Sequence, residues 1–512
     1  MSNFPSLPSV KTKAFPAPAP NGQGRGLFVS VDLKPCDDIL HIRSPFVAVL
    51  DTERLEDTCS GCFGKRQLES EVESGSRLGL KACTGCQVVR YCDKTCQAKD
   101  WKLAHSRECA IYKNLKPRIL PINARALLRM VLRTGAKKEP YTPDELDLFQ
   151  SLETHVREIR EANKGQFERI ALTSKAVKEY SGASMEEEVL SAYGAKLDLN
   201  SFNLTNALYD RVGMYLHPYA ALINHSCDYN AVMGFDGAEL YIKAVRPIAK
   251  DEQIFISYID TTFPKRIRQK ELRERFFFTC QCIKCTEEDA NPEQEPEPTS
   301  PAGIVSKTAY SLLKSSFTSA DEGAVGTLMQ GFISFRLPKT KQPFVSVFDE
   351  LIVREIPDQL NHAFLHCALR FLRIDPVVYV HEAHPLRAVH AWALARITLQ
   401  ISQEYPDLKF PTFKSSDNSE QDGGSLSKSP GAAFDYGLLA WALLAELVGN
   451  EMKYCTVPGF RDMVRRAFGE VHEEFLRHGV DPREMRDEVR REWTTLRMVA
   501  GNYWKCSLLE AD

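Results

Sequence analysis

The chain carries NHSCDYN at residues 224–230 and CQCIKC at residues 280–285, and these two stretches decide its fold. The second stretch supplies three thiolates in a C-x-C-x2-C pattern, whereas a structural zinc site takes four ligands in a tetrahedron. The fourth ligand must therefore come from elsewhere, and Cys227 in the first stretch is the candidate. Such a site would clip the NHSCDYN segment against the chain that follows Tyr258, because metal binding and folding are linked.

Four further pairs of metal-ligating residue types lie between residues 59 and 109. Two are C-x2-C pairs, and two have an i, i+4 spacing that suits one face of a helix. Eight ligands fill two tetrahedral sites. The alternative, a set of buried free cysteines, is disfavoured by so many close spacings. The pairs are Cys59 with Cys62, Cys83 with Cys86, Cys92 with Cys96, and His105 with Cys109.

Length and composition bound the class of protein. The 512 residues predict two to four domains, and 43% hydrophobic with 26% charged residues is an ordinary globular composition. A net charge of −3 argues against nucleic-acid binding by overall charge. The longest apolar run, Tyr436–Val448, contains Glu446 and falls short of the ~20 residues that span a membrane.

The N-terminus is Pro-rich and has no apolar core of a secretory signal. Reduced thiolates on zinc are therefore a better interpretation of the 15 cysteines than disulfides. We expect a cytoplasmic and/or nuclear protein.

Strand-type sequence lies on both sides of the cysteine-rich segment. A tight turn at residues 24–26 leads into strands up to residue 50, and the first 20 residues are expected to be disordered. Further strand candidates are Glu239–Val245 and Gln253–Ile259. Between the two strand regions, residues 110–200 indicate helices.

The last part of the chain indicates a separate helical region. An acidic, Pro-rich linker precedes it, and a polar loop at residues 411–432, expected to be disordered, interrupts it. The clearest helix has an apolar face with i, i+3, i+4 spacing. That face is formed by Tyr436, Leu439, Ala440, Leu443, Leu444 and Leu447.

The residues 59–109 resemble a MYND finger, including Tyr91, Gln97 and Trp101 around the later ligand pairs. The resemblance implies cross-braced pairs and a surface for proline-rich peptides. The 20 residues between Cys62 and Cys83 exceed the usual spacing of that finger. The implied ligand sets are Cys59, Cys62, Cys92 and Cys96 for one zinc, and Cys83, Cys86, His105 and Cys109 for the other.

Several segments, taken in their order along the chain, resemble the SET-and-MYND family of protein lysine methyltransferases. They are GRGL at residues 24–27, NSF at residues 200–202, NHSC at residues 224–227, Tyr258, and the three cysteines of residues 280–285. The resemblance implies an α+β protein: a split SET β-fold with an inserted MYND zinc finger and a helical insert, followed by a C-terminal all-α, tetratricopeptide-like domain. The implied parts are a disordered N-terminus (1–20), the first SET part (21–58), the finger (59–109), the helical insert (110–199), the core SET (200–265), the post-SET zinc segment (266–287), the acidic linker (288–302) and the helical domain (303–512).

The resemblance implies S-adenosylmethionine and three structural zinc ions as cofactors, the third zinc held by Cys227, Cys280, Cys282 and Cys285. Tyr258 is the catalytic candidate, a phenol that aligns a neutral lysine amine. The chain reads NHSCDYN where the family reads NHSCDPN, so Tyr229 is expected to change the stiffness of the loop. The cofactor-binding candidates are Gly24, Arg25, Gly26, Asn200, Asn224, His225 and Phe278.

The function that follows is transfer of a methyl group to lysine in a histone or non-histone protein. The alternative is a catalytically weak zinc-finger adaptor or chromatin-associated corepressor that recruits partner proteins. Retention of Tyr258, Asn224 and the late cysteines favours the enzyme. We expect a monomer without membrane or direct nucleic-acid partners.

Overall fold

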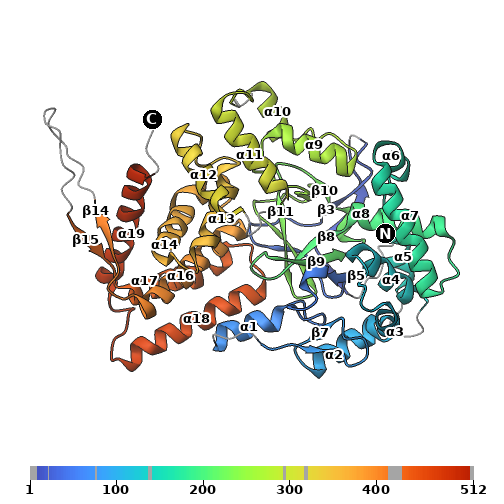
Figure 1. The fold of residues 1–512 in the computed structure, drawn as a ribbon, viewed down its shortest axis with the longest axis horizontal. Helices are drawn as coiled ribbons and strands as arrows, with labels where there is room; N and C mark the ends of the chain where they lie inside the picture. The colour runs from blue at the N-terminus through green and yellow to red at the C-terminus, as the bar shows by residue number, and fades with distance from the viewer. Residues whose placement is uncertain are drawn as a thin grey trace. The chain divides into compact units, whose positions relative to one another are not determined.

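The computed structural model describes residues 9–20, 22–74, 78–135, 141–291, 296–315, 321–412 and 429–507. The chain divides into two compact units, both drawn in Figure 1. Unit 1 comprises Met1–Ile259, Arg266–Thr286 and Cys455–Met463, and unit 2 comprises Asp260–Lys265, Glu287–Tyr454 and Val464–Asp512. Residues 455–463, which lie within the predicted helical region 303–512, belong to unit 1 in this division.

The N-terminal residues of unit 1 form strands. β1 (Val10–Thr12) pairs with β4 (Asp38–Ile42), and β2 (Ala14–Pro18) pairs with β3 (Arg25–Val29). The predicted disorder is wrong for residues 9–20, because prolines fit a strand such as β2 that has β3 as its one paired neighbour. Residues 1–8 lie outside the described residues.

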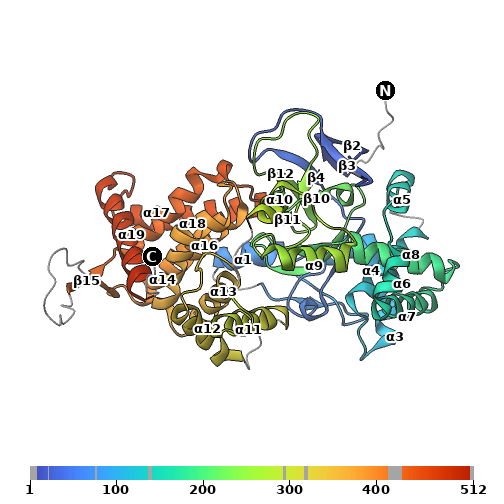
Figure 2. The ribbon, with the colours of Figure 1, turned by 90° about the horizontal axis from the view of Figure 1, so that it is seen from above.

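A four-stranded antiparallel sheet runs in the order β1-β4-β12-β11. Its last two members, β11 (Ala231–Asp236) and β12 (Glu239–Ala244), form a hairpin directly after the NHSCDYN segment. Figure 2 shows this sheet beside the β2–β3 pair. The predicted strand Glu239–Val245 is confirmed to within one residue.

A three-stranded sheet joins chain segments that are far apart in the sequence. β5 (Val47–Leu50) pairs with β9 (Arg211–Leu216), which in turn pairs with β8 (Phe202–Thr205). The cysteine-rich segment and six helices are therefore inserted between neighbouring strands of one sheet. Gly213 allows this pairing, because a Cβ there would lie 2.1 Å from the carbonyl oxygen of Val49.

The insert is helical, as predicted for residues 110–200. Its central helix, α4, is buried along most of its length and packs against α7, α8 and β5 (Figure 1). Its helices are α3 (Ser106–Leu115), α4 (Ile122–Thr134), α5 (Pro143–Gln150), α6 (Val156–Ala162), α7 (Lys164–Ser181) and α8 (Glu187–Asn200).

Two predicted local structures are wrong in detail. Only Gly24 of the GRG turn has a positive φ, at 71°, whereas Arg25 and Gly26 already belong to β3. Of the predicted strand Gln253–Ile259, only β13 (Phe255–Ile256) is regular. The strand ends at Ile256 because the backbone beyond it bonds to side chains. The N–H of Tyr258, for example, donates to the ring of His225.

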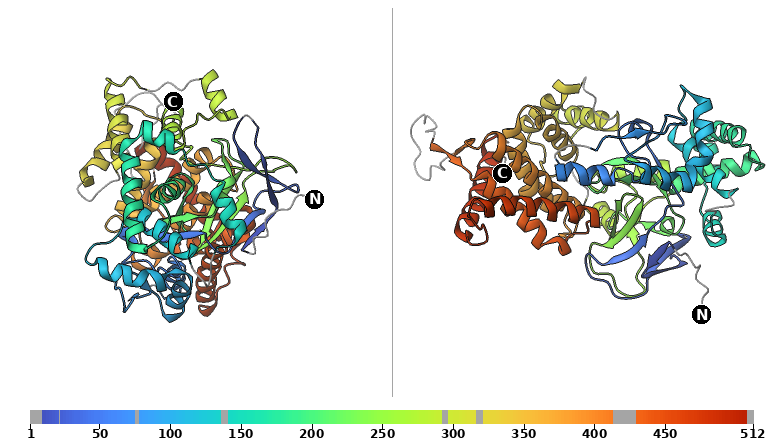
Figure 3. Two further views of the ribbon diagram at one scale, coloured as in Figure 1. Left: turned by 90° about the vertical axis from the view of Figure 1, so that its right-hand side faces the viewer. Right: turned by 90° about the horizontal axis from the view of Figure 1, so that it is seen from below.

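Unit 2 is mainly helical, and its helices pack side by side (yellow to red in Figure 3). The predicted apolar face of α17 is buried, as expected. The loop predicted at residues 411–432 lies largely outside the described residues, and its ends form the strand pair β14 (Lys409–Thr412) and β15 (Ser429–Ala433). The principal helices are α11 (Pro301–Ser315), α12 (Glu322–Ser334), α13 (Phe344–Glu355), α14 (Leu360–Leu369), α16 (Pro385–Glu404), α17 (Tyr436–Gly449), α18 (Pro458–Arg477, with its first residues in unit 1) and α19 (Arg486–Ser507).

The buried Arg129 of α4 ties the cysteine-rich segment to the sheets. Its guanidinium donates to both carboxylate oxygens of Glu108, at 2.7 and 2.8 Å, and to the carbonyl oxygen of Ala48 at 2.9 Å. It also lies 3.2 Å from Asp100, which accepts a hydrogen bond from the hydroxyl of Tyr91. The guanidinium thus supplies a cation to two buried carboxyl groups.

We predict that Arg129→Met lowers the free energy of unfolding by about 3–5 kcal/mol, because it leaves two buried carboxylates without a cation. Chemical denaturation of the zinc-loaded chain measures this value. The control is Arg118→Met at an exposed position, with an expected change within about 0.5 kcal/mol. Equal effects of the two substitutions would contradict the role of Arg129.

Candidate functional site

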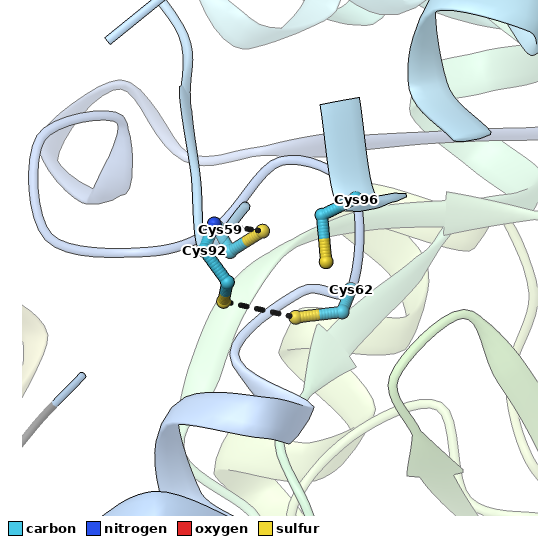
Figure 4. A group of neighbouring side chains, drawn as sticks. All are labelled: Cys59, Cys62, Cys92 and Cys96. Carbon is cyan, nitrogen blue, oxygen red and sulfur yellow. Dashed lines mark hydrogen bonds between the residues drawn. The ribbon is translucent and has the colours of Figure 1, made fainter. Parts of the chain in front are cut away.

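The first group of metal-ligating side chains consists of Cys59, Cys62, Cys92 and Cys96, whose sulfur atoms lie within 4.8 Å of one another. Figure 4 shows the four side chains converging on one point from the turn before α1 (Lys65–Ser74), from the residue after β7 (Arg90–Tyr91) and from α2 (Lys94–Asp100). The expectation that both members of the third pair lie on a helix is wrong for Cys92, which follows β7. Four thiolates in this arrangement fit a tetrahedral zinc ion.

The second group consists of Cys83, Cys86, His105 and Cys109, all buried. The Nε2 atom of His105 lies 3.4 Å from the sulfur of Cys83 and 3.6 Å from that of Cys86. Its Nδ1 atom lies 3.6 Å from the carboxylate of Glu108. Three thiolates and one imidazole nitrogen in this arrangement also fit a tetrahedral zinc ion.

The third group consists of Cys227, Cys280, Cys282 and Cys285, in the set that the two sequence stretches predict. The sulfur atoms of Cys227 and Cys285 are 3.6 Å apart although 58 residues separate them. These four thiolates likewise fit one zinc ion.

Two buried side chains of α9 (Lys265–Phe276) support the third group, and sequence reasoning missed both. The side chain of Gln269 donates to the carbonyl oxygen of Cys280 at 2.7 Å and to the sulfur of Cys285 at 3.3 Å, and accepts from the N–H of Cys280 at 3.0 Å. Arg268 donates to the sulfur of Cys285 at 3.7 Å. The sequence carried no signal for them, because α9 is strongly polar throughout.

The NHSCDYN segment lies directly against the strand that precedes Tyr258. β10 (Asn224–His225) pairs in parallel with β13, with Asn224 opposite Phe255. The buried Asn230 holds the same strand, because it accepts from the N–H of Phe255 at 2.8 Å and donates to the carbonyl oxygen of Gln253 at 2.9 Å. Asn230 is thus a structural support of the site that was not among the predicted site residues.

His225 connects Tyr258 to the third metal group. Its Nδ1 atom accepts the backbone N–H of Tyr258 at 3.0 Å, and its Nε2 atom lies 3.4 Å from the sulfur of Cys227. Burial lowers the pKa of His225 to about 4, so the ring is neutral at pH 7. Since Nδ1 accepts a hydrogen bond, Nε2 carries the ring proton and donates to Cys227.

The phenol of Tyr258 lies among aromatic rings. Its ring centre is 5.0 Å from that of Phe276, 5.3 Å from His225 and 6.5 Å from Phe278. Its hydroxyl donates to the carbonyl oxygen of Ile223 at 2.6 Å. Burial raises the pKa of Tyr258, so the hydroxyl keeps its proton at neutral pH and is not a base.

The glycine-rich start of β3 contacts the NHSCDYN segment. The amide of Asn224 donates to the carbonyl oxygen of Arg25 at 3.2 Å. A Cβ on Gly26 would lie 2.5 Å from the side chain of Gln253 and 3.2 Å from that of Asn224. The backbone at Gly26 is therefore held close to both side chains, in a cradle that a larger residue would fill.

The side chains of two predicted cofactor residues, Asn200 and Arg25, are not among the contacts described for Gly26 and Asn224, and a Cβ on Gly24 would meet nothing within 4 Å. Asn200, at the end of α8, donates to the carbonyl oxygens of Lys196 and Glu153. The side chain of Arg25 is exposed. Their roles toward a cofactor stay predictions, whereas Gly26, Asn224, His225, Tyr258 and Phe278 are connected through the contacts described above.

Comparison with known proteins places these features in a family. Residues 24–259 match the SET domain family. Histone-lysine N-methyltransferase ASHR1 of Arabidopsis thaliana is 30% identical over 271 residues, which are 52% of this chain and 53% of that protein. Histone-lysine N-methyltransferase SMYD3 of Homo sapiens is 34% identical over 239 residues, 45% of this chain and 55% of that protein. SET domain and MYND-type zinc finger protein 6 of Schizosaccharomyces pombe is 32% identical over 273 residues, which are 53% of this chain and 52% of that protein.

The match thus spans about half the length of each of these relatives. One similar solved structure is the SET domain of LSMT bound to lysine and AdoHcy. The match has 12% sequence identity and a TM-score of 0.24, and it covers 91% of this chain and 88% of the LSMT chain. A score of this size does not establish a common fold. Among the described residues, no helix has the length and apolar character needed to cross a bilayer.

The family match and the site together define a mixed α/β SET-domain protein with three groups of metal-ligating side chains. Its matches include proteins named as SET-and-MYND proteins and lysine methyltransferases, so the chain carries a SET domain and is similar to that family.

We predict about three zinc ions per chain, because twelve ligands fill three tetrahedral sites. Metal analysis of the purified, folded protein measures the number. Cys285→Ala should lower it to about two, since the third site then keeps three thiolates. The control is Cys367→Ala, a buried cysteine outside the three groups, which should leave the number unchanged. Folded protein with close to no zinc would refute the assignment.

Proposed function

We propose that the chain is an S-adenosylmethionine-dependent protein-lysine N-methyltransferase. The observation that carries the proposal is the position of the Tyr258 phenol: it lies among aromatic rings and is joined through His225 to the NHSCDYN segment and the third metal group. The family match and the names of the relatives support the same reaction.

S-adenosylmethionine, when bound, supplies a methyl group on a positively charged sulfur. The substrate amine must be neutral to accept it, and deprotonating a free lysine at pH 7 costs about 4–5 kcal/mol. An aromatic, poorly hydrated site lowers this cost because it disfavours the ammonium form. The chain therefore needs no strong base, in agreement with the raised pKa of Tyr258.

The phenol of Tyr258 would orient the reacting groups and not transfer a proton. Its hydroxyl hydrogen is committed to the carbonyl oxygen of Ile223. The lone pairs of the hydroxyl oxygen are left to accept weak C–H···O contacts from a methyl group or a hydrogen bond from an amine. The Nδ1 atom of His225 holds the backbone at Tyr258, and the contact of Nε2 with Cys227 orients the ring, so the phenol is held in place before substrate arrives.

The cradle at Gly26 and Asn224 would hold the amino-acid end of S-adenosylmethionine, and the backbone of His225 would meet its adenine. Phe278, with its ring centre 5.8 Å from that of His225, would form part of the wall. Arg25 and Asn200 are further candidates for the cofactor carboxylate and amine. The close approach of backbone to side chains at Gly26 supports this placement.

The finer domain description belongs to the same proposal. The first two metal groups would form a MYND finger inserted into the SET domain, with a surface for proline-rich peptides. The helices of unit 2 would form a tetratricopeptide-like domain that docks partner proteins. The location of residues 51–201 between paired strands β5 and β9 supports an insertion.

We predict that Tyr258→Phe lowers turnover by on the order of 10²-fold or more while cofactor affinity changes little, because the hydroxyl positions the reacting groups. Radiolabel transfer from S-adenosylmethionine to protein extracts and calorimetry with the cofactor measure the two quantities. Tyr219→Phe is the matched control, since Tyr219 is another buried phenol that donates to a backbone carbonyl, that of Ala14 at 2.7 Å. Unchanged turnover in Tyr258→Phe would remove Tyr258 from this role.

We further predict that two substitutions of His225 separate its two bonds. His225→Asn keeps an acceptor near the N–H of Tyr258 but loses the donor to Cys227, so affinity for the third zinc should fall about 10–100-fold. His225→Gln reaches toward Cys227 but loses the acceptor, so turnover should fall more than zinc affinity. A chelating dye and turnover assays give the two readouts, and identical profiles of the two variants would contradict the linking role.

The alternative, an adaptor with weak catalysis, has a distinct outcome in these experiments. Calorimetry would show S-adenosylmethionine binding, but no label would reach any protein in the extracts, the chain itself included. Label that appears with wild type and disappears with Tyr258→Phe would favour the enzyme.

A further inference from the structure

Two cysteines outside the three metal groups lie in contact within unit 1. The sulfur atoms of Cys36 and Cys455 are 3.7 Å apart, although 419 residues separate them in the sequence. Cys36 is half-buried in the turn before β4, and Cys455 is buried at the start of the segment Cys455–Met463. Neither thiol is needed as a metal ligand, because each of the three groups already has four.

One backbone carbonyl holds both residues. The carbonyl oxygen of Ala244, at the end of β12, accepts the N–H of Cys36 at 2.7 Å and the thiol of Cys455 at 3.1 Å. Cys36 itself has a φ of 72°, a left-handed conformation that a non-glycine residue adopts only when its surroundings hold it there. The backbone of Cys36 and the thiol of Cys455 are therefore held at the same carbonyl oxygen, which keeps the two sulfur atoms in contact.

The two thiols differ in their surroundings. The hydrogen bond from Cys455, followed by the nearby cations Lys243 and Arg461, lowers the pKa of Cys36, against the opposing effects of burial and Asp37. The pKa of Cys455 is raised, first by its bond to Cys36 and then by burial. Such an asymmetry suits one thiol to attack as a thiolate and the other to follow.

We propose that Cys36 and Cys455 form a reversible redox pair that closes to a disulfide under hydroperoxide or glutathione disulfide. The Cys36 thiolate attacks the peroxide oxygen, which gives a sulfenic acid and releases water after proton uptake. The Cys455 thiol then attacks that sulfur, which forms the S–S bond and expels a second water. Overall, two thiols are oxidised and one hydrogen peroxide is reduced to two waters.

With glutathione disulfide the electrons balance in the same way. Cys36 displaces one glutathione thiolate and forms a mixed disulfide, and Cys455 displaces the second glutathione. One glutathione disulfide is thereby reduced to two glutathione thiols, and the two cysteine thiols are oxidised to one disulfide. In both routes Cys36, the half-buried member, meets the oxidant, and Cys455 reacts from inside unit 1.

The disulfide would fasten residues 455–463 to the sheet of unit 1. Those residues pack within unit 1, whereas the residues on either side of them, Glu287–Tyr454 and Val464–Asp512, belong to unit 2. A covalent bond at Cys455 would therefore restrain the point at which the chain enters unit 1 for the last time. This inference does not depend on the proposed methyl transfer.

The test uses the full-length, zinc-loaded protein in a graded series of glutathione and glutathione disulfide, and separately with hydrogen peroxide. After blocking of free thiols, peptide mapping by mass spectrometry identifies cross-links, while metal analysis follows bound zinc. We expect a peptide pair joined through Cys36 and Cys455, lighter by two hydrogen atoms, while zinc stays bound. Dithiothreitol should reverse it.

Three variants sharpen the result. Cys36→Ser and Cys455→Ser should each abolish the cross-link, whereas Cys367→Ser, a matched change at a buried cysteine without a thiol neighbour among the described residues, should leave it intact. The wild-type map decides the matter even if a variant fails to fold. Absence of the cross-link up to the oxidant level that releases zinc, or capture of Cys36 only as a mixed disulfide with glutathione, would overturn the proposal.

Discussion

The neutral imidazole of His225 is the constraint on which the site depends. One ring nitrogen accepts the backbone N–H of Tyr258 and the other donates to Cys227, a member of the third metal group. The two bonds require one tautomer, so the backbone at Tyr258 and the thiolate at Cys227 select the same state of the ring. A zinc ion in that group would favour the thiolate form of Cys227. The thiolate in turn favours the tautomer with its proton on Nε2, which leaves Nδ1 free to accept the N–H of Tyr258.

Arg129 plays a comparable part for the inserted segment. Burying one cation among Asp100, Glu108 and the carbonyl oxygen of Ala48 is costly unless every partner is in place. The same arrangement therefore specifies where the cysteine-rich segment docks on the sheet. Glu108 also faces the Nδ1 atom of His105, so the docking interaction and the second metal group share a carboxylate.

The metal-ligating residues of the site could be predicted because zinc-binding cysteines occur at short, regular spacings in the sequence. Three thiolates at residues 280–285 demand a fourth, and the arithmetic led to Cys227 without any knowledge of the fold. The buried contacts of Gln269 with Cys280 and Cys285 could not be predicted, because α9 is strongly polar and nothing in its composition marks which amide faces inward. Likewise, the proline-rich start of the chain concealed two strands, since their pairing with β3 and β4 is decided by tertiary contacts.

The pair Cys36 and Cys455 shows the same limit at the longest range. In the sequence each is a scattered cysteine with no spacing signal, and the helical character of the chain after residue 303 gives no reason to place residue 455 beside a strand of the first unit. In the fold, both residues bond to the carbonyl oxygen of Ala244, and their thiols lie together there. Metal-ligating cysteines can be recognised from sequence because four ligands must meet at one ion, and several of them lie close together along the chain. A redox pair needs only two residues and a fold that keeps them in contact, so it leaves no such spacing.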